Sequence, residues 1–410
     1  MGKSDIIVGL DIGTTKICAV VGEATPDGVA IVGIGTSPSH GLRGGVVVHI
    51  GQTVESIRRA LEDAELMAGC DIGTVYVGIA GSHIKGFNSH GVIAVKGDEV
   101  TQKDVDRAMD AAKAIAIPLD REVIHALPQE FIIDDQRGIL EPKGMAGVRL
   151  EVEVHIVTGA VTSVQHIVRA CHRGDLDVAD IVLESLASAK AVLTEEEREL
   201  GVALVDIGGG TTDIAIFHND SIRYTSVLGL GGQNLTNDIA QGLHTPVASA
   251  EEIKLQYGCA MLDLVQQDEI IEVRSVGGRL PRRLPRSTIA EICQPRMDEM
   301  LFLVDQELTK SGCKHLIGAG VVLTGGTALL DGCQELSEQI FNLPTRIGYP
   351  LNTGGLRDVV ASPQYATAVG LLCYGAENIG MEPRFPRTAG SGNMFGRILK
   401  SMRKWLRDIS

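Results

Sequence analysis

The sequence predicts an α/β fold built from two related domains with a cleft between them. A short motif occurs twice, nearly half a chain apart: residues 7–20 are IVGLDIGTTKICAV and residues 203–217 are ALVDIGGGTTDIAIF. Each copy is an apolar run of strand length, then Asp-Ile-Gly and a Gly/Thr turn, then a second β-rich run, which is the pattern of a β-hairpin. Helical patterns alternate with strand-like runs elsewhere. A hairpin found twice in such a chain indicates two similar domains that face each other.

Composition supports a large folded protein and disfavours several other classes. The chain has 410 residues, of which 44% are hydrophobic, so it can bury a sizeable core. Its net charge of −15 disfavours nucleic acid as a partner. Eight cysteines without a C-x-x-C pair favour buried thiols over zinc sites or disulfides. No signal-peptide pattern and no run of 18 apolar residues occurs, so we expect a cytoplasmic protein.

The first half of the chain alternates helices with strands. Apolar spacing predicts a helix over residues 53–67 and a buried strand over 75–80. A second helix is expected over residues 100–116, where Thr101 and an acid three residues later form a capping-box variant. Strands dominate residues 130–158, with Gly/Pro turns between them. The segment 84–159 therefore has the pattern of a small α/β unit inserted into the first domain.

In the second half, helical spacing predicts helices over residues 249–257 and 288–310. Between them lie a strand-like run over 270–276 and a basic turn over 279–286, whose sequence is RLPRRLPR. Closely spaced small residues over 366–376 predict a helix packed tightly on another. The Pro/Gly/Ser-rich stretch 382–392 predicts a flexible linker.

Three glycine-containing turns form a candidate nucleotide site. Phosphate oxygens need many backbone N–H donors, and a magnesium ion held through water needs nearby carboxylates. Either of the first two turns, taken alone, could belong to an ordinary hairpin without a ligand. Because the two turns occur in matching sequence contexts, a ligand shared by both is favoured. A third strand, residues 320–324, ends in two glycines that would let a flat ring approach the backbone. The candidate binding residues are Gly13, Thr14, Thr15, Lys16, Gly208, Gly209, Gly210, Thr211, Thr212, Gly325, Gly326 and Thr327.

Taken in order, the three turns resemble the signature of the actin, Hsp70 and sugar-kinase superfamily over nearly the full chain. The resemblance implies two RNase H-like domains that bind ATP with Mg²⁺ in the cleft between them. It implies that Asp11 and Asp206 orient the waters of the metal. It also adds Glu251 and Lys254, near the ribose or adenine, and the pair Gly231 and Gly232 to the nucleotide-binding residues.

The inserted segment resembles that of the FtsA family of bacterial cell-division proteins. Residues 120–159, residues 78–91, and the runs LGLGGQNLTNDIAQGL and EEIKLQYGCA carry this resemblance. It implies the following division of the chain. Residues 1–83 and 160–195 form subdomain 1A, 84–159 the insert 1C, 196–228 and 311–381 subdomain 2A, 229–310 subdomain 2B, 382–392 the linker, and 393–410 a membrane-targeting amphipathic helix.

Whether the bound ATP is hydrolysed stays open at this point. Related actin-like proteins use a Gln or Glu at the start of the first connecting helix to orient water, and Glu184 occupies the matching place. A Glu near a helix start is also favoured by the helix dipole alone. We therefore expect Glu184, with Asp11 and Asp206, to be the catalytic candidates of a slow ATPase, if there is one.

The last 18 residues have the pattern of an interfacial amphipathic helix. On a helical wheel the apolar side chains gather within an arc of about 140°, and the basic ones occupy the opposite sector. A helix docked on the protein itself or on a partner helix is the alternative. The expected membrane contacts are the apolar Phe395, Ile398, Leu399, Met402, Trp405 and Leu406 and the basic Arg397, Lys400, Arg403 and Lys404.

The family resemblance implies the partners and the place of action. The partners are the C-terminal peptide of the tubulin-like protein FtsZ, other copies of the chain in an actin-like protofilament, anionic lipids, and later division proteins bound through 1C. The place of action is the septum, on the cytoplasmic side of the inner membrane. Alternatives are a pilus-assembly protein like PilM, or a small-molecule phosphotransferase. The FtsZ contact is expected in 2B, at the basic turn 279–286 and the helix that follows it, although a cluster of basic residues is often only a solvated charged face. Its candidate residues are Arg279, Arg282, Arg283, Arg286, Ile289 and Arg296.

Overall fold

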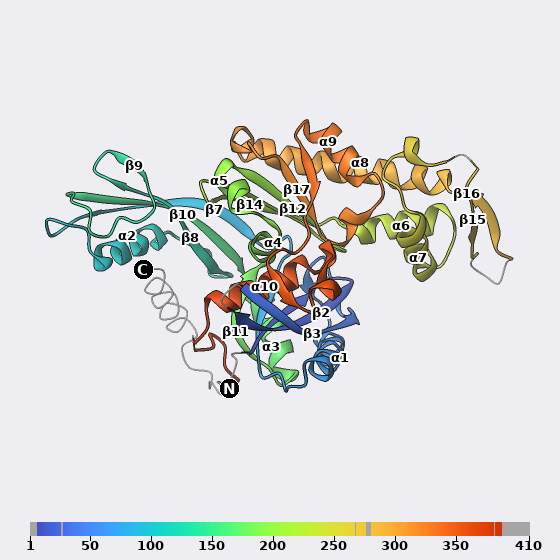
Figure 1. Cartoon of the computed structure of the whole chain (residues 1–410), viewed down its shortest axis with the longest axis horizontal. Helices are drawn as coiled ribbons and strands as arrows, with labels where there is room; N and C mark the ends of the chain where they lie inside the picture. Colours follow the sequence, from blue (N-terminus) through green and yellow to red (C-terminus); the bar gives the residue numbers. More distant parts are fainter. Residues whose placement is uncertain (1–5, 26–27, 267, 276–279, 381, 388–410) are drawn as a thin grey trace.

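The computed structural model describes residues 6–25, 28–266, 268–275, 280–380 and 382–387. The expected membrane helix 393–410, with all ten of its membrane-contact residues, lies outside the described residues. So do residues 388–392 of the expected linker and Arg279. Figure 1 shows two sheet-based domains one above the other, with a further unit projecting from each side.

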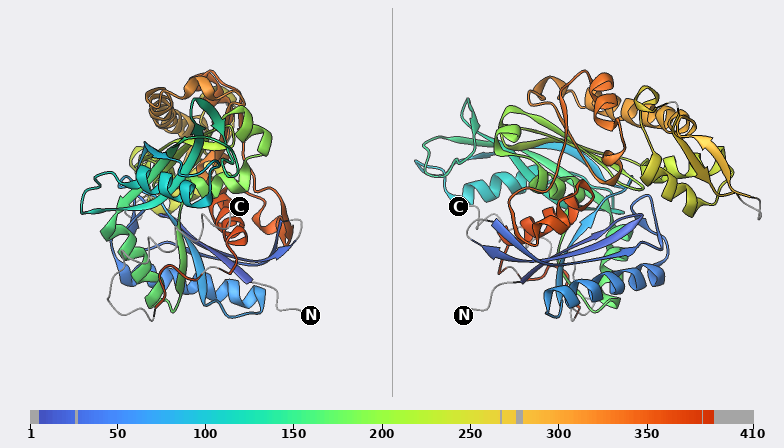
Figure 2. Two further views of the ribbon diagram at one scale, coloured as in Figure 1. Left: turned by 90° about the vertical axis from the view of Figure 1, so that its left-hand side faces the viewer. Right: turned by 45° about the vertical axis from the view of Figure 1, so that its right-hand side comes forward.

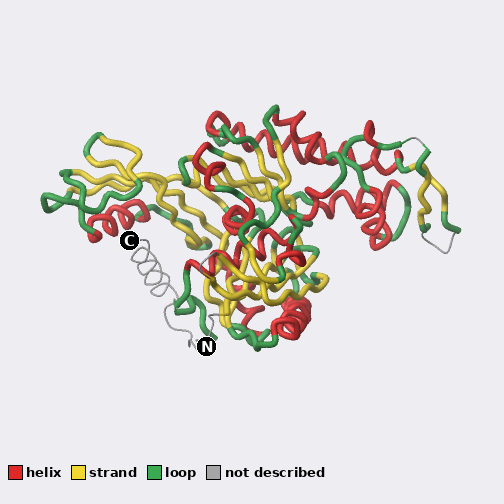
Figure 3. Tube along the Cα trace, viewed as in Figure 1, coloured by secondary structure: helices red, strands yellow, loops and turns green. Residues whose placement is uncertain are grey.

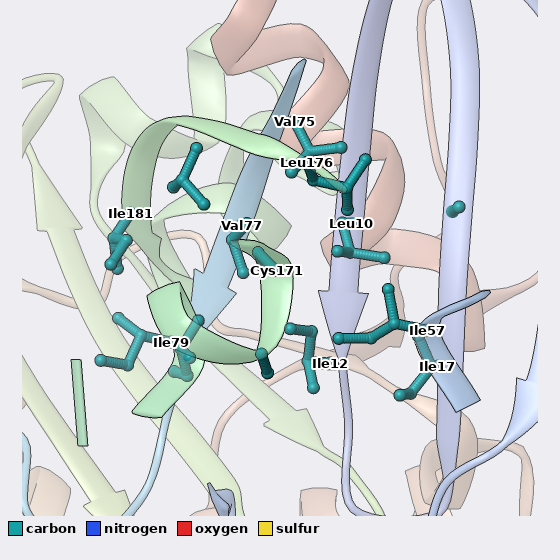
Figure 4. Packing of buried hydrophobic residues seen from close by; sticks show 14 of the residues in the cluster. Leu10, Ile12, Ile17, Ile57, Val75, Val77, Ile79, Cys171, Leu176 and Ile181 are labelled. Carbon is teal, nitrogen blue, oxygen red and sulfur yellow. The ribbon is translucent and has the colours of Figure 1, made fainter. Parts of the chain in front are cut away.

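The first domain is a six-stranded sheet in the order β11-β6-β1-β2-β3-β19. Helices α1 (Ile50–Ala68) and α3 (Val161–Arg173) cover one face, and Figure 4 shows side chains of this core, among them Leu10, Ile57 and Cys171. The strands are β1 (Ile6–Ile12), β2 (Lys16–Thr25), β3 (Gly28–Pro38), β6 (Thr74–Ile79), β11 (Asp177–Leu183) and β19 (Thr353–Gly355), with a small separate ribbon of β4 (Leu42–Arg43) and β5 (Val46–Val47).

The second domain repeats this plan with a five-stranded sheet in the order β14-β13-β12-β17-β18. Its strands are β12 (Val202–Ile207), β13 (Thr212–His218), β14 (Ser221–Leu228), β17 (Val321–Thr324) and β18 (Thr345–Ile347). Helices α8 (Ser287–Lys310), α9 (Cys333–Phe341) and the arm helices pack on one face. The short helix α5 (Glu195–Leu200) precedes β12, and 3₁₀ turns lie at Leu262–Leu264, Lys314–Leu316, Gly326–Leu329, Arg357–Val360 and Pro363–Tyr365.

Two helices lie between the sheets and connect the domains. Helix α4 (Glu184–Val192) packs against strands of the second sheet, and α10 (Ala366–Glu377) packs against strands of the first. The two helices contact each other closely, because Gly370 of α10 has no side chain: a Cβ there would overlap the carbonyl oxygen of Ala187 in α4. Figure 2 shows α10 between the two sheets in both views. The expected tight helix packing over 366–376 is confirmed.

The insert forms its own four-stranded sheet in the order β7-β10-β8-β9, with helix α2 (Gln102–Lys113) on one face. Its strands are β7 (Lys85–Ala94), β8 (Arg121–Ile133), β9 (Gln136–Ile139) and β10 (Arg149–Ala160). Helix α2 begins as predicted: Thr101 Oγ1 donates to Asp104 Oδ2 over 2.5 Å, and the Thr101 amide donates to the same oxygen over 3.1 Å. The insert projects to the left in Figure 1, away from the cleft.

The second projecting unit is an arm of helices and one ribbon on the opposite side of the molecule (Figure 3). Helices α6 (Gly232–Gly242) and α7 (Val247–Tyr257) and the antiparallel pair β15 (Ile270–Val273) and β16 (Arg282–Pro285) form it with α8. The expectation of a basic turn over 279–286 was wrong in part. Residues 282–285 form strand β16 because they pair with β15 in register.

The expected linker also needs a correction, because residues 382–387 pack on the first domain. Phe385 is only 5% exposed, belongs to the first core, and forms an antiparallel bridge with Val178 of β11. The Arg384 guanidinium lies 2.9 Å from Asp180 Oδ1. Backbone pairing at a free sheet edge and burial of an aromatic ring hold this segment, which we call the strap (residues 382–387). The Pro-rich composition of this segment predicted a flexible linker, and composition does not show that the segment packs on the first domain.

No helix among the described residues is long and apolar enough to cross a bilayer. All eight cysteines are free thiols.

Candidate nucleotide site between the two domains

A pocket of about 620 Å³ opens where the two hairpins meet. Sixteen residues expected from the sequence line it, and they come from both domains and from α7. They are Asp11, Gly13, Thr14, Thr15, Lys16, Glu184, Asp206, Gly208, Gly209, Gly210, Thr211, Glu251, Lys254, Gly325, Gly326 and Thr327. The structure thus brings residues more than 300 positions apart to one cavity. Thr212, Gly231 and Gly232 do not line it.

The two hairpins have turns of equal length. The last pairs before the turns are Ile12 with Ile17 and Ile207 with Thr212, so each turn contains four residues. The turns also touch: a Cβ on Gly209 would overlap the side chain of Thr15, and one on Gly210 would overlap Thr14. These glycines are needed because the first turn carries threonines where the second must leave space. The approach gathers backbone N–H groups of both turns at one end of the pocket.

Four carboxyl groups face this end of the pocket: Asp11, Glu184, Asp206 and Asp213. Burial raises the pKa of Asp11 to about 7, against an opposing effect of Lys16, and the nearby Asp206 raises it further. Burial, followed by the charge of Asp11, raises the pKa of Glu184 well above its usual range. Burial also raises the pKa of Asp206. A cation would relieve this crowding of negative charge, because opposite charge favours the ionised carboxylates.

Sequence reasoning missed Asp213. It lies directly opposite Asp206 in the β12–β13 register, so both side chains are on the same face of the hairpin. Its Oδ1 atom is buried without a hydrogen-bond partner among the described residues, and burial raises its pKa well above the usual value. The run DIGGGTTD contained the signal, since a four-residue turn after Asp-Ile places the last Asp opposite the first.

An orphaned buried carboxylate oxygen beside three other carboxyl groups fits Mg²⁺, which prefers oxygen ligands and keeps several of its waters. No group of three or more described His, Cys, Asp or Glu side chains is arranged to ligate a metal directly. The residues present therefore suit an ion held through water, with Asp11, Asp206 and Asp213 as the acceptors.

Lys16 reaches from the first hairpin to the segment just before α10. Its Nζ donates to the Gln364 carbonyl oxygen over 2.9 Å and lies 4.1 Å from the centre of the Tyr365 ring. Both the carbonyl and the aromatic face attract a cation. A phosphate oxygen would compete with these partners for the ammonium group, so Lys16 is placed to serve as a phosphate contact.

The other end of the pocket is built around a cation and a carboxylate on α7. Lys254 Nζ lies 2.8 Å from Glu251 Oε2 and donates to the Gly232 carbonyl over 3.2 Å. Thr236 of the neighbouring helix α6 donates to the same Glu251 oxygen. A charged pair of this kind gives donors and acceptors for ribose hydroxyls or an adenine edge.

Gly231 and Gly232 support the second turn from behind. The Gly232 amide donates to the Gly208 carbonyl over 2.9 Å, and a Cβ on Gly231 would lie only 2.7 Å from that same oxygen. Thr212 Oγ1 donates to the Leu230 carbonyl over 2.9 Å, away from the cavity. These three residues hold the turn in place rather than line the site.

Glu184 is the first residue of α4, as expected, and its side chain lines the pocket beside the hairpins. A Cβ on Gly78 of β6 would lie only 3.0 Å from Glu184 Cγ, so this glycine leaves the carboxyl group its space. The role of Glu184 as a water-orienting residue stays a prediction. The burial that raises its pKa favours a neutral acid in the absence of a cation.

Family comparisons agree with this geometry. A family model described as "Cell division protein FtsA" matches residues 203–370, and one described as "SHS2 domain inserted in FTSA" matches residues 81–158. The cell division protein FtsA of Pseudomonas aeruginosa is 55% identical over 91% of this chain and 89% of its own length. That of Neisseria meningitidis serogroup B is 46% identical over 97% of each chain, and that of Escherichia coli K12 is 43% identical over 99% and 96%.

The chain belongs to the FtsA family of cell-division proteins.

Solved structures with lower identity share the fold of this FtsA-family chain. The PilM-PilN type IV pilus biogenesis complex matches with a TM-score of 0.66 and 17% identity, covering 90% of this chain and 98% of that one. MreB5 of Spiroplasma citri bound to ADP matches with a TM-score of 0.54 and 15% identity over 91% and 98%. These likenesses confirm an actin-like α/β fold. Because the family match is with FtsA, the PilM-like and phosphotransferase alternatives are disfavoured.

The residues expected to contact FtsZ have varied surroundings. Ile289 is fully buried in the core of the second domain, so it offers no contact surface in this conformation. The Arg286 guanidinium lies 2.6 Å from Asp331 and 3.1 Å from Glu269, and Arg296 lies 2.5 Å from Asp238. Ion pairs therefore occupy these two charges. Arg282 and Arg283 of β16 are exposed, and the Arg282 guanidinium donates to the Leu243 carbonyl oxygen.

Proposed function

We propose that this FtsA-family chain binds ATP and Mg²⁺ in the cleft, polymerises, and tethers FtsZ to the inner face of the cytoplasmic membrane at the septum. The observation that carries the nucleotide part is the pocket itself. It joins two touching glycine turns to four carboxyl groups, of which Asp11, Asp206 and Asp213 are buried, and such a group of acids would be stabilised by a cation. Solved structures of Spiroplasma citri MreB5 bound to ADP and to AMPPNP share this fold, which supports a nucleotide as the ligand.

In this proposal each end of the pocket has its own task. The two turns and Lys16 hold the phosphates, and Glu251 and Lys254 hold the nucleoside. Asp11, Asp206 and Asp213 hold the waters of the metal, which supplies charge neutralisation at the phosphates when bound. Glu184 would orient an attacking water if ATP is hydrolysed.

Calorimetric titration with ATP, in Mg²⁺ and in EDTA, tests the nucleotide proposal. We expect binding that Mg²⁺ strengthens, and we expect Asp206→Asn to remove most of that gain. The exposed Asp358→Asn variant is the matched control. Absence of binding by the wild-type chain would contradict the proposal. Loss of slow phosphate release in Glu184→Gln, with ATP binding retained, would support the hydrolytic role.

The tail carries the membrane part of the proposal. Each basic residue close to anionic lipid contributes about 1 kcal/mol, and the apolar face of an amphipathic helix adds to this, so one tail binds reversibly. A filament would bind many tails at once and raise the avidity by a factor of about 10² to 10⁴. Co-sedimentation with anionic liposomes, with and without residues 393–410, tests the tether. Equal pelleting of both forms would overturn it.

Partner binding is proposed for the two projecting units. We keep the arm (2B) for the FtsZ peptide, with the exposed Arg282 and Arg283 as its first candidates, and the insert (1C) for later division proteins. Fluorescence titration with an FtsZ C-terminal peptide tests the arm. Arg282→Glu and Arg283→Glu should weaken binding, because these side chains are exposed. Unchanged affinity in both would move the site elsewhere.

A further inference from the structure

One oxygen of Asp206 lies at a junction of three elements. Ser188 of α4 donates to Asp206 Oδ2 over 2.6 Å, and Thr367 of α10 donates to the same oxygen over 3.2 Å. The two hydroxyl oxygens lie 3.0 Å apart, and because each hydroxyl carries a single proton, donation by both to Oδ2 leaves no proton for a hydrogen bond between them. Asp206 itself is on β12 of the second domain. A single carboxylate oxygen thus joins the second sheet to both helices that connect the domains.

The surroundings of this group are dry. Ser188 is fully buried, and Asp206 and Thr367 are both more than nine-tenths buried. A buried carboxylate is costly unless hydrogen bonds satisfy it, and bonds to a charged group are the stronger ones. The two hydroxyls satisfy Oδ2 and leave the other oxygen, Oδ1, beside Gly325 in the pocket, where a Cβ on that glycine would overlap it.

The two donors come from the two helices that connect the domains. Helix α4 packs on strands of both sheets and α10 on strands of the first, and the two helices touch at Gly370 and Ala187. Both hydroxyls can reach Oδ2 only while the two helices keep this register. The orientation of the carboxylate is therefore tied to the relative position of the two domains.

We propose that Ser188 and Thr367 are positioning residues that orient Asp206 toward the waters of the metal ion. This inference rests on the proposed binding of a magnesium nucleotide in the cleft. Thr367 lines the pocket and Ser188 does not, but in this proposal both act through Asp206. Their contribution is specific to the cation, because the phosphate and nucleoside contacts come from other residues.

The test compares ATP affinity in Mg²⁺ and in EDTA for Ser188→Ala, Thr367→Val and Thr367→Ser. A hydrogen bond to a charged group contributes enough for about a tenfold change. We expect Ser188→Ala and Thr367→Val each to lower the Mg²⁺-dependent gain in affinity about tenfold. The affinity in EDTA should stay within about twofold of wild type. Thr367→Ser keeps the hydroxyl and should restore the gain.

Ser337→Ala is the matched control for Ser188→Ala, because Ser337 is also a fully buried helical serine, with its hydroxyl on the Cys333 carbonyl of α9. It should change stability only. Thermal unfolding without ligand shows whether each variant folds, and one folded variant of the two is enough to decide the matter. In an Asp206→Asn background, Thr367→Val should have no further effect on the Mg²⁺ dependence.

The outcomes distinguish a failure of the positioning role of Ser188 and Thr367 from a failure of the proposed nucleotide binding. Equal losses of affinity in Mg²⁺ and in EDTA, or wild-type behaviour of both Ser188→Ala and Thr367→Val, would overturn the positioning role while nucleotide binding stands. A wild-type chain whose ATP affinity does not depend on Mg²⁺ would overturn the proposed function, and the positioning role with it.

Discussion

Asp206 and Asp213 lie directly opposite each other on the two strands of one hairpin, and both side chains line the same pocket. Two like charges opposite each other in a sheet are destabilising, and burial adds to the cost. The hairpin therefore keeps a pair that weakens the empty protein, an arrangement expected where a bound cation restores the balance.

Replacing one member of this pair should stabilise the unliganded chain. We expect Asp213→Asn to raise the free energy of unfolding by about 1–2 kcal/mol, because it removes like-charge repulsion between buried groups. Urea unfolding without Mg²⁺ or nucleotide measures this. The exposed Asp358→Asn control should stay within about 0.5 kcal/mol of wild type. A clear destabilisation by Asp213→Asn would show that the carboxylate is satisfied in the empty state.

Asp11 should make the unliganded chain less stable as the pH rises. Its pKa is about 7 in the folded chain and 3.8 unfolded, so between these values the folded state binds more protons. Stability is therefore lost as the pH rises from about 4 to about 7, by at most about 4 kcal/mol. Urea unfolding at several pH values should show a shallower slope in Asp11→Asn. The same slope in both proteins would mean that Asp11 is ionised throughout.

Two buried histidines should act with the opposite sign. Burial lowers the pKa of both His125 and His155 to about 4, so the unfolded chain binds more protons between pH 4 and 6.5. Each should contribute stability that is fully present above about pH 6.5 and lost as the pH falls toward 4, by at most about 3 kcal/mol.

His155 offers the cleaner test, because its ring is held on both sides: one nitrogen lies 2.6 Å from Asn88 within the insert, and the other lies 2.9 Å from Thr225 of the second domain. His155→Asn should flatten the acid limb of the stability curve, measured by thermal unfolding from pH 4 to 7. An unchanged acid limb would contradict a neutral His155.

The contact between the connecting helices should tolerate no added methyl group. Gly370→Ala would press a Cβ on the Ala187 carbonyl, and overpacking of this kind costs about 1–3 kcal/mol. Gly51→Ala is the matched control, since Gly51 is an exposed glycine in α1 whose Cβ would meet only the His49 side chain at 3.4 Å. It should be neutral or stabilise by up to about 1 kcal/mol. Chemical unfolding compares the two, and equal effects would contradict the close packing.

The strap should matter for the stability of the first domain. Phe385→Ala removes a buried ring from the core and should cost about 3–5 kcal/mol. Phe302→Ala is a suitable control, because Phe302 is 55% exposed on α8 and should change little. Urea unfolding measures both. Small, equal effects would mean that residues 382–387 are a free linker after all.

Much of the fold followed from local patterns. The hairpins around Asp11 and Asp206 and the capping box at Thr101 are formed by residues close together in sequence. The strap did not follow, because it is held by Val178, a partner distant in sequence. Strand β16 did not follow either, because its run of arginines and prolines gives no sign of the pairing between Ile271 and Leu284. Composition alone cannot show such a partner.

The sequence by itself predicted most of the residues that line the pocket: the two Gly/Thr turns, the acids before them, and the Glu and Lys of α7. These depend on side-chain chemistry and short-range spacing, which a linear text preserves. Only the tertiary structure decided that Ile289 is buried and that Ser188 and Thr367 hold Asp206. Those facts depend on which faces of distant elements meet, and the packing of two domains through α4 and α10 sets them.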